Sequence, residues 1–76
     1  MTITRVHFEG ASPIKEVLDY DNLTDATEAT LKHARKRYKH AWITNMWPDG
    51  VDVWACDHPD YPGFGEGFYL HVIPPE

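Results

Sequence analysis

The side chains best suited to chemistry lie in one short stretch of the sequence. Four of them stand close together: Cys56, Asp57, His58 and Asp60. Thiolate, imidazole and carboxylate groups are the ligands that zinc and nickel take in proteins. A Cys-x-His spacing lacks the paired ligands of a structural zinc module, however, and an odd cysteine is more often a small apolar core residue. We therefore expect neither a metal site nor a cofactor.

Two other chemistries have only some of the residues that they need. Cys56 beside a histidine could act as a nucleophile, but such a pair also needs a cleft and a third group that orients the base. The glycine-rich run at residues 63–67, GFGEG, looks like a phosphate-binding loop. It precedes a strand, however, and lacks both the lysine and the following helix that phosphate binding uses. We therefore predict that the protein is not an enzyme and has no catalytic residues.

One helix organises the rest of the predicted fold. Residues 22–41 repeat their apolar side chains with a period of 3.6 residues. Asn22 is suited to cap the first turn, and Asp25 complements it three residues on. The face predicted to pack on a sheet carries Leu23, Thr27, Leu31, Ala34, Tyr38 and Ala41.

Two strand-like segments precede this helix. Residues 2–9 alternate in polarity and predict a first strand. Residues 14–20 predict a second strand that completes a hairpin, although the charged Glu16 falls on its inward side. The alternative is a short helix, with Ser12 as its cap and Pro13 as its first residue. We favour the strand.

The chain after the helix predicts a hairpin and a last strand. Residues 42–47 and 51–57 flank a turn at 48–50, where proline and glycine suit a tight reversal. Residues 58–67 predict a loop, and residues 68–73 alternate as the last strand. The predicted class is therefore α+β, with one helix on one face of a four- or five-stranded antiparallel sheet in the order ββαβββ.

Length and composition predict a single domain covering residues 1–76. The chain has 76 residues, 42% of them hydrophobic and 13% aromatic, which suits one small core. No apolar run approaches the roughly 18 to 20 residues of a membrane span, and the first residues lack the pattern of a signal peptide. The single cysteine fits a reducing compartment. We expect a soluble, cytoplasmic protein.

Charge is unevenly distributed along the chain. The net charge is −5, yet five of the seven basic residues lie between positions 32 and 39, and the other two stand against all twelve acids. We term Lys32, Arg35, Lys36 and Lys39 the basic ridge. The helix dipole favours cations in the last turns of a helix, and binding of a partner is the other explanation. The spacing also suits a phosphate backbone, although the acidic remainder of the chain would repel nucleic acid.

The second face of the sheet is the main predicted interface. One helix covers one face, and on the other face the predicted register exposes Trp42, Met46, Trp54 and Tyr69, a patch of the kind that marks binding sites. Three covers remain open. They are the loop at 58–67 with its Tyr61 and Phe64, a second copy of the chain in a homodimer, and a larger protein. The predicted partner-binding residues are therefore Trp42, Met46, Trp54, Tyr69, Tyr61, Phe64 and the basic ridge, namely Lys32, Arg35, Lys36 and Lys39.

The segment YDNLTDATEA at residues 20–29, a strand that runs into a Leu-x-Asp-Ala helix start, resembles small phage-encoded inhibitors. These include compact β-hairpin, helix, strand proteins that shut down host RNA polymerase and some anti-CRISPR proteins of similar length. The resemblance lies in the order of elements over most of the chain. It implies a non-enzymatic protein that binds and blocks a larger host protein or complex in the bacterial cytoplasm. The alternative is a small accessory protein that contacts nucleic acid through the basic helix at 32–40.

Overall fold

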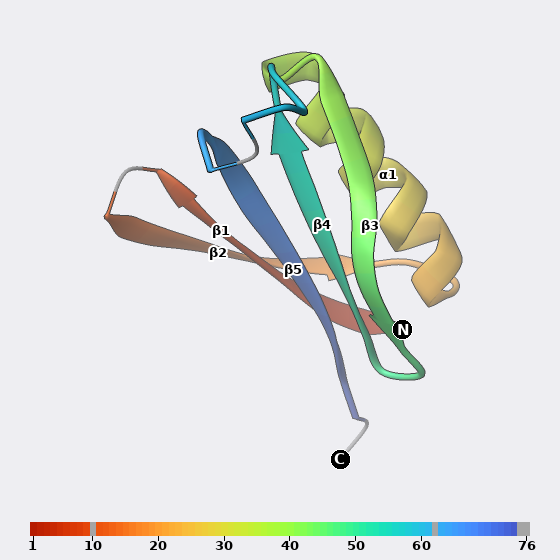
Figure 1. Ribbon diagram of the computed structural model, residues 1–76. Helices are drawn as coiled ribbons and strands as arrows, with labels where there is room; N and C mark the ends of the chain where they lie inside the picture. Colours follow the sequence, from red (N-terminus) through yellow and green to blue (C-terminus); the bar gives the residue numbers. More distant parts are fainter. Residues whose placement is uncertain (10, 62, 75–76) are drawn as a thin grey trace.

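The described residues, 1–9, 11–61 and 63–74 of the computed structural model, form five strands and one helix in the order ββαβββ. The elements are β1 (Thr2–Glu9), β2 (Ser12–Asp19), α1 (Leu23–Arg37), β3 (His40–Trp47), β4 (Gly50–Cys56) and β5 (Gly65–Ile73). Neighbouring strands pair antiparallel in the sheet order β2-β1-β5-β4-β3. Helix α1 packs against β3, β4 and β5 on one face (Figure 1). The expected α+β class is confirmed.

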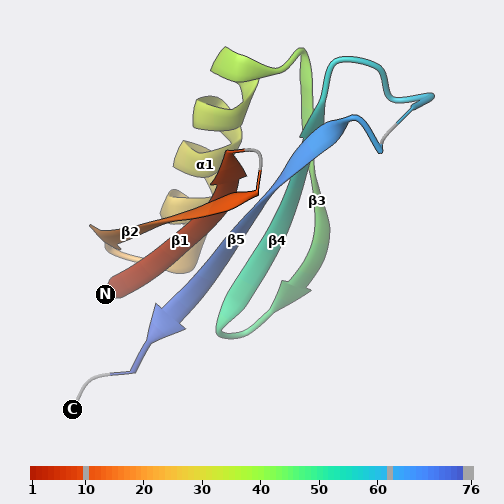
Figure 2. The same cartoon turned by 90° about the vertical axis from the view of Figure 1, so that its left-hand side faces the viewer.

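The sheet is twisted, so its two ends relate differently to the helix. β1 and β2 curl toward the side on which α1 lies, whereas the connection between β4 and β5 projects to the other side (Figure 2). Such curling follows from the twist of antiparallel strands. We term the face away from α1 the outer face. Within the described residues, no helix is long and apolar enough to cross a membrane.

The helix begins where the sequence predicts and ends earlier. The Asn22 side-chain oxygen accepts a hydrogen bond from the backbone N–H of Asp25 at 2.8 Å, which caps the first turn. The predicted end at Ala41 is wrong, because Tyr38 already takes an extended backbone with φ −130° and ψ 153°. The next N–H, of Lys39, donates to the Asp57 carboxylate at 2.9 Å. A hydrogen bond to a residue distant in sequence therefore replaces the helical pattern of hydrogen bonds after Tyr38.

The core lies between α1 and the sheet. Phe68 and Leu70 of β5 are 0% and 3% exposed and face α1. The buried helix residues are small, which lets the helix axis approach the strands closely. The other core side chains are Ile3, Ala26, Ala34, Ala41, Val51, Val53 and Ala55.

A β-bulge in β3 changes which side chains face the helix. Pairing with β4 runs from His40 to Ile43 and resumes at Asn45, so Thr44 is an extra residue. An extra residue reverses the alternation of side chains beyond it. Met46 consequently pairs with Val51 on the helix side of the sheet. The prediction that Met46 lies on the outer face is therefore wrong.

The structure decides between the two alternatives for β2, and it shows that β5 is longer than predicted. Residues 12–19 form a strand, so the short-helix alternative for this segment is wrong. β5 begins at Gly65, and its first three residues pair with β4, where the sequence predicts loop. Cys56 is a buried free thiol, in keeping with the structural role expected for an odd cysteine.

Candidate functional site

An aromatic side chain from each of four neighbouring strands lies on the outer face. We term Phe8 of β1, Tyr69 of β5, Trp54 of β4 and Trp42 of β3 the aromatic band. Trp42 pairs directly with Trp54 across the β3–β4 ladder. Phe8, Trp42 and Tyr69 are 43%, 36% and 40% exposed, and Trp54 is partly buried. The prediction of exposed Trp42 and Tyr69 on this face is confirmed, whereas Phe8 had not been assigned to it.

Two glycines of β5 provide the floor of the aromatic band. A Cβ atom placed on Gly67 would overlap the Tyr69 hydroxyl, and one on Gly65 would lie 2.9 Å from the Trp54 indole nitrogen. The Tyr69 and Trp54 rings therefore lie over bare backbone. An aromatic ring that packs over a glycine covers the backbone of the glycine and helps to fix the register of the strand.

The loop between β4 and β5 leaves its own aromatic side chains in solvent. Tyr61 is 66% exposed and Phe64 is 84% exposed. Side chains that covered the aromatic band would be buried against it. Of the three covers that the sequence leaves open, the loop is therefore ruled out, because Tyr61 and Phe64 do not cover the aromatic band. The loop projects on the same side of the sheet as the outer face (Figure 2).

The remaining predicted residues do not join this face. Met46 lies on the helix side because of the bulge. The basic ridge is exposed on α1 and on the residues that follow it, away from the outer face. One of its members is tied to the fold, because Arg35 Nη2 donates to the Ala41 carbonyl oxygen at 3.0 Å. The ridge and the aromatic band are therefore two surfaces.

Sequence reasoning missed a buried ionic network on the helix side of the sheet. Arg5 Nη2 donates to Glu16 Oε2 at 2.9 Å. The two ring nitrogens of His7 lie 2.9 Å from Glu66 Oε2 and 3.4 Å from Glu16 Oε1. The Tyr38 hydroxyl donates to Glu66 Oε1 at 3.1 Å. The side chains of Arg5, His7 and Glu66 are 8%, 5% and 5% exposed.

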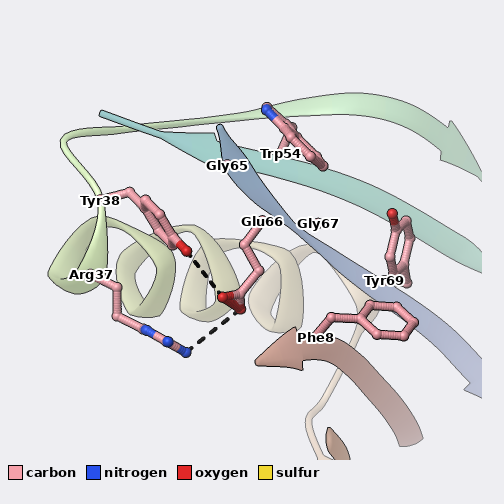
Figure 3. A pocket seen from close by; sticks show the side chains of 8 residues that line it. All are labelled: Phe8, Arg37, Tyr38, Trp54, Gly65, Glu66, Gly67 and Tyr69. Carbon is pink, nitrogen blue, oxygen red and sulfur yellow. Dashed lines mark hydrogen bonds and ion pairs between the residues drawn. The ribbon is translucent and has the colours of Figure 1, made fainter. Parts of the chain in front are cut away.

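The network links four elements and includes β1 and β2, the two strands against which α1 packs least. Its residues come from β1, β2, β5 and the end of α1, where Arg37 adds an ion pair to Glu66 at 3.6 Å (Figure 3). The His7 ring also stacks on Phe68, with ring centroids 5.2 Å apart. Buried charges need such mutual pairing, because each would otherwise lose its hydration without replacement. The network therefore fastens the β1–β2 hairpin to the rest of the molecule.

Three groups in and around the network have shifted pKa values. Burial alone would raise the pKa of the Glu16 carboxyl, but hydrogen bonding and charge attraction, from Arg5 first, lower it below its usual value. Burial lowers the pKa of the His33 imidazole, and the nearby charge of Arg5 acts in the same direction. Burial raises the pKa of the Tyr38 hydroxyl, and its hydrogen bond to Glu66 raises it further.

A hollow of about 520 Å³ lies where β1 leaves β5 (Figure 3). The β1–β5 ladder ends at the pair His7–Phe68, while β5 stays paired with β4 as far as Gly65. The hollow is bordered by Phe8, Arg37, Tyr38, Trp54, Gly65, Glu66, Gly67 and Tyr69. His7 is buried, and both oxygens of Glu66 already accept hydrogen bonds. The hollow therefore borders both the aromatic band and the buried network.

In the part of the chain that the structure describes, no group of three or more His, Cys, Asp or Glu side chains could hold a metal ion. Comparison with protein-family models, with curated proteins and with solved structures found no match. The candidate site is therefore defined by its geometry, with the aromatic band at its centre.

Proposed function

We propose that this protein acts without catalysis, by binding a larger protein through the outer face. The observation that carries the proposal is the aromatic band, in which four large rings from four adjacent strands stand partly in solvent. Aromatic residues dominate the energetics of protein interfaces, because each removes a large area from water at a small entropic cost. Partly exposed rings that lie next to one another across a sheet are therefore suited to a macromolecular partner.

The surroundings of the aromatic band support a protein partner. The body outside the basic segment is acidic, and the outer face carries Asp52 beside Tyr69 in the β4–β5 ladder. Such a surface repels the phosphates of nucleic acid. Tyr61 and Phe64 of the β4–β5 loop are exposed as well and offer further apolar area to a partner. The resemblance to phage inhibitors adds the consequence of binding, which is occlusion of a site on a host machine such as a CRISPR or transcription complex.

The test begins with the tagged protein as bait in a bacterial lysate. A retained protein is then purified, and its affinity is measured for the wild type and for variants. Trp42→Ala and Tyr69→Ala should each weaken binding by about tenfold or more, because each removes a partly exposed ring from the band. Met46→Ala is the matched control, since it removes an exposed apolar side chain from the opposite side of the sheet.

Two results would overturn the proposal. The first is an affinity that both aromatic variants leave unchanged while reversal of Lys32, Lys36 and Lys39 to Glu abolishes it, which would move the site to the basic ridge. The second is tight binding to bare DNA or RNA with a steep dependence on salt concentration, which would indicate the nucleic-acid function instead.

A further inference from the structure

A second apolar surface lies on the other side of the sheet, at its β3 edge. A hollow of about 300 Å³ separates the first half of α1 from β3. Two of the side chains on its β3 wall are open to solvent, Ile43 at 38% and Met46 at 66%. The apolar residues that line it include Leu23, Leu31, Ile43, Met46, Trp47 and Val51. This surface shares no residue with the aromatic band.

The edge strand itself is poorly suited to receive another strand. An unpaired edge offers hydrogen-bonding groups to any extended chain, but a bulge breaks their regular spacing. In β3 the bulge falls between Ile43 and Asn45, in the middle of the strand. The same bulge turns Met46 into the hollow. A partner at this edge must therefore be held by side chains.

Charge along α1 indicates what that partner is. Glu28 borders the hollow from the first half of the helix. Arg35, one of the last-turn cations, lies on the same side of the helix, because it reaches the Ala41 carbonyl oxygen in β3. Lys32 lies between them and is exposed. This side of α1 therefore changes from negative charge, at the hollow, to positive charge in the turns that follow it.

We propose that this surface binds a second copy of the chain across a twofold axis, with the two α1 helices antiparallel. In that arrangement Glu28 faces the cationic turn of Lys32 and Arg35 of the partner subunit, and the reverse contact forms by symmetry. Leu31 lies near the axis, and the exposed side of Met46 packs against the same surface of the other copy. A parallel arrangement would place like charges opposite each other. The surface thus carries its own complement in charge.

The first test is the oligomeric state of the purified protein over a range of concentrations, by light scattering and sedimentation. The wild type should form a dimer, and Met46→Glu should weaken it by about tenfold or more, because a carboxylate replaces an apolar contact. Met46 is two-thirds exposed in the monomer, so its variant should keep the wild-type fold. Tyr69→Glu, on the outer face, is the matched control and should leave the dimer intact.

The second test uses charge exchange between copies. Glu28→Lys and Lys32→Glu should each weaken self-association, by about fivefold or more, because attraction at both symmetric contacts becomes repulsion. Mixing the two variants should restore a dimer that holds one copy of each. A change confined to one helix cannot produce that recovery.

Three results would overturn the proposal: a monomer at every concentration up to roughly millimolar, a dimer that Tyr69→Glu breaks and Met46→Glu does not, or variants whose mixture stays as weak as each alone. The proposal is independent of the outer-face function. Loss of the dimer in Met46→Glu with binding of the outer-face partner retained would separate the two surfaces.

Discussion

Replacing Glu66 tests whether the buried network holds the hairpin to the rest of the fold. The Glu66 carboxylate is 5% exposed and receives the His7 ring nitrogen at 2.9 Å and the Tyr38 hydroxyl at 3.1 Å. In Glu66→Ala both groups lose their acceptor within the protein. In Glu66→Gln the side chain keeps its shape and one acceptor oxygen, and it loses its charge.

The expected magnitudes follow from this geometry. Leaving a buried hydrogen-bonding group without its partner costs about 1 to 3 kcal/mol, and Glu66→Ala leaves two such groups, the His7 ring and the Tyr38 hydroxyl. A domain of this length has a total stability of about 4 to 11 kcal/mol. Glu66→Ala should therefore remove a large part of the stability, or all of it. Glu66→Gln should cost about 1.5 to 3 kcal/mol, the range of a hydrogen bond to a charged group.

Urea denaturation followed by circular dichroism measures both variants against the wild type. Asp60→Ala, an exposed carboxylate in the β4–β5 loop, is the control and should stay within about 0.5 kcal/mol of the wild type. A free energy of unfolding for Glu66→Ala that matches this control would refute the argument, since the network would then contribute nothing to holding the hairpin.

Two further predictions concern the helix and the response to acid. Leu31→Ala should cost about 2 kcal/mol, because this partly buried side chain packs on the core, whereas Lys36→Ala should change the melting temperature little; equal melting temperatures would contradict the orientation of α1. Stability should fall on acidification in two stages. Because the folded state lowers the pKa of His33, its contribution is present above the ordinary value of 6.5 and is lost below it. The lowered pKa of Glu16 likewise gives stability that is present above 4.5 and is lost as pH falls further. A His33→Gln variant should lack the first stage in a pH series of urea denaturation, and a profile identical to the wild type would contradict the assignment.

The parts of the fold that the sequence predicts are those set by local chemistry. Asn22 starts the helix through a side chain that bonds three residues ahead, and the strands follow from alternation of polarity. The alternation of Phe68 with Tyr69 correctly separates core from outer face in β5. These signals depend on neighbours in the chain, so they can be read without knowledge of the tertiary structure.

The parts that the sequence does not predict depend on contacts between distant residues. The helix ends early because the Lys39 N–H donates to Asp57, and Met46 changes sides because Thr44 adds one residue to β3. Glu16 looked intrusive in its strand, yet it lies directly across from Arg5 in the β1–β2 ladder. A charged residue at an inward position on each of two adjacent strands was the available signal for the network.

The residues of the candidate site likewise fall into those predicted from local patterns and those placed by contacts between distant residues. Trp42 and Tyr69 were predicted from alternation within regular strands, and both lie on the outer face. Phe8 joins them because β1 pairs with β5, and this pairing brings the two ends of the chain together. The involvement of Gly65 and Gly67 could not be predicted from a segment that reads as loop by composition.

Covalent side-chain labelling of the purified complex tests the central claim most directly, because it reports which residues the partner covers. Binding through the outer face should protect Trp42 and Tyr69 from labelling, while Lys36 and Lys39 of the basic ridge react as in the free protein. Protection of the two lysines, with Trp42 and Tyr69 labelled as fully as before, would contradict the account.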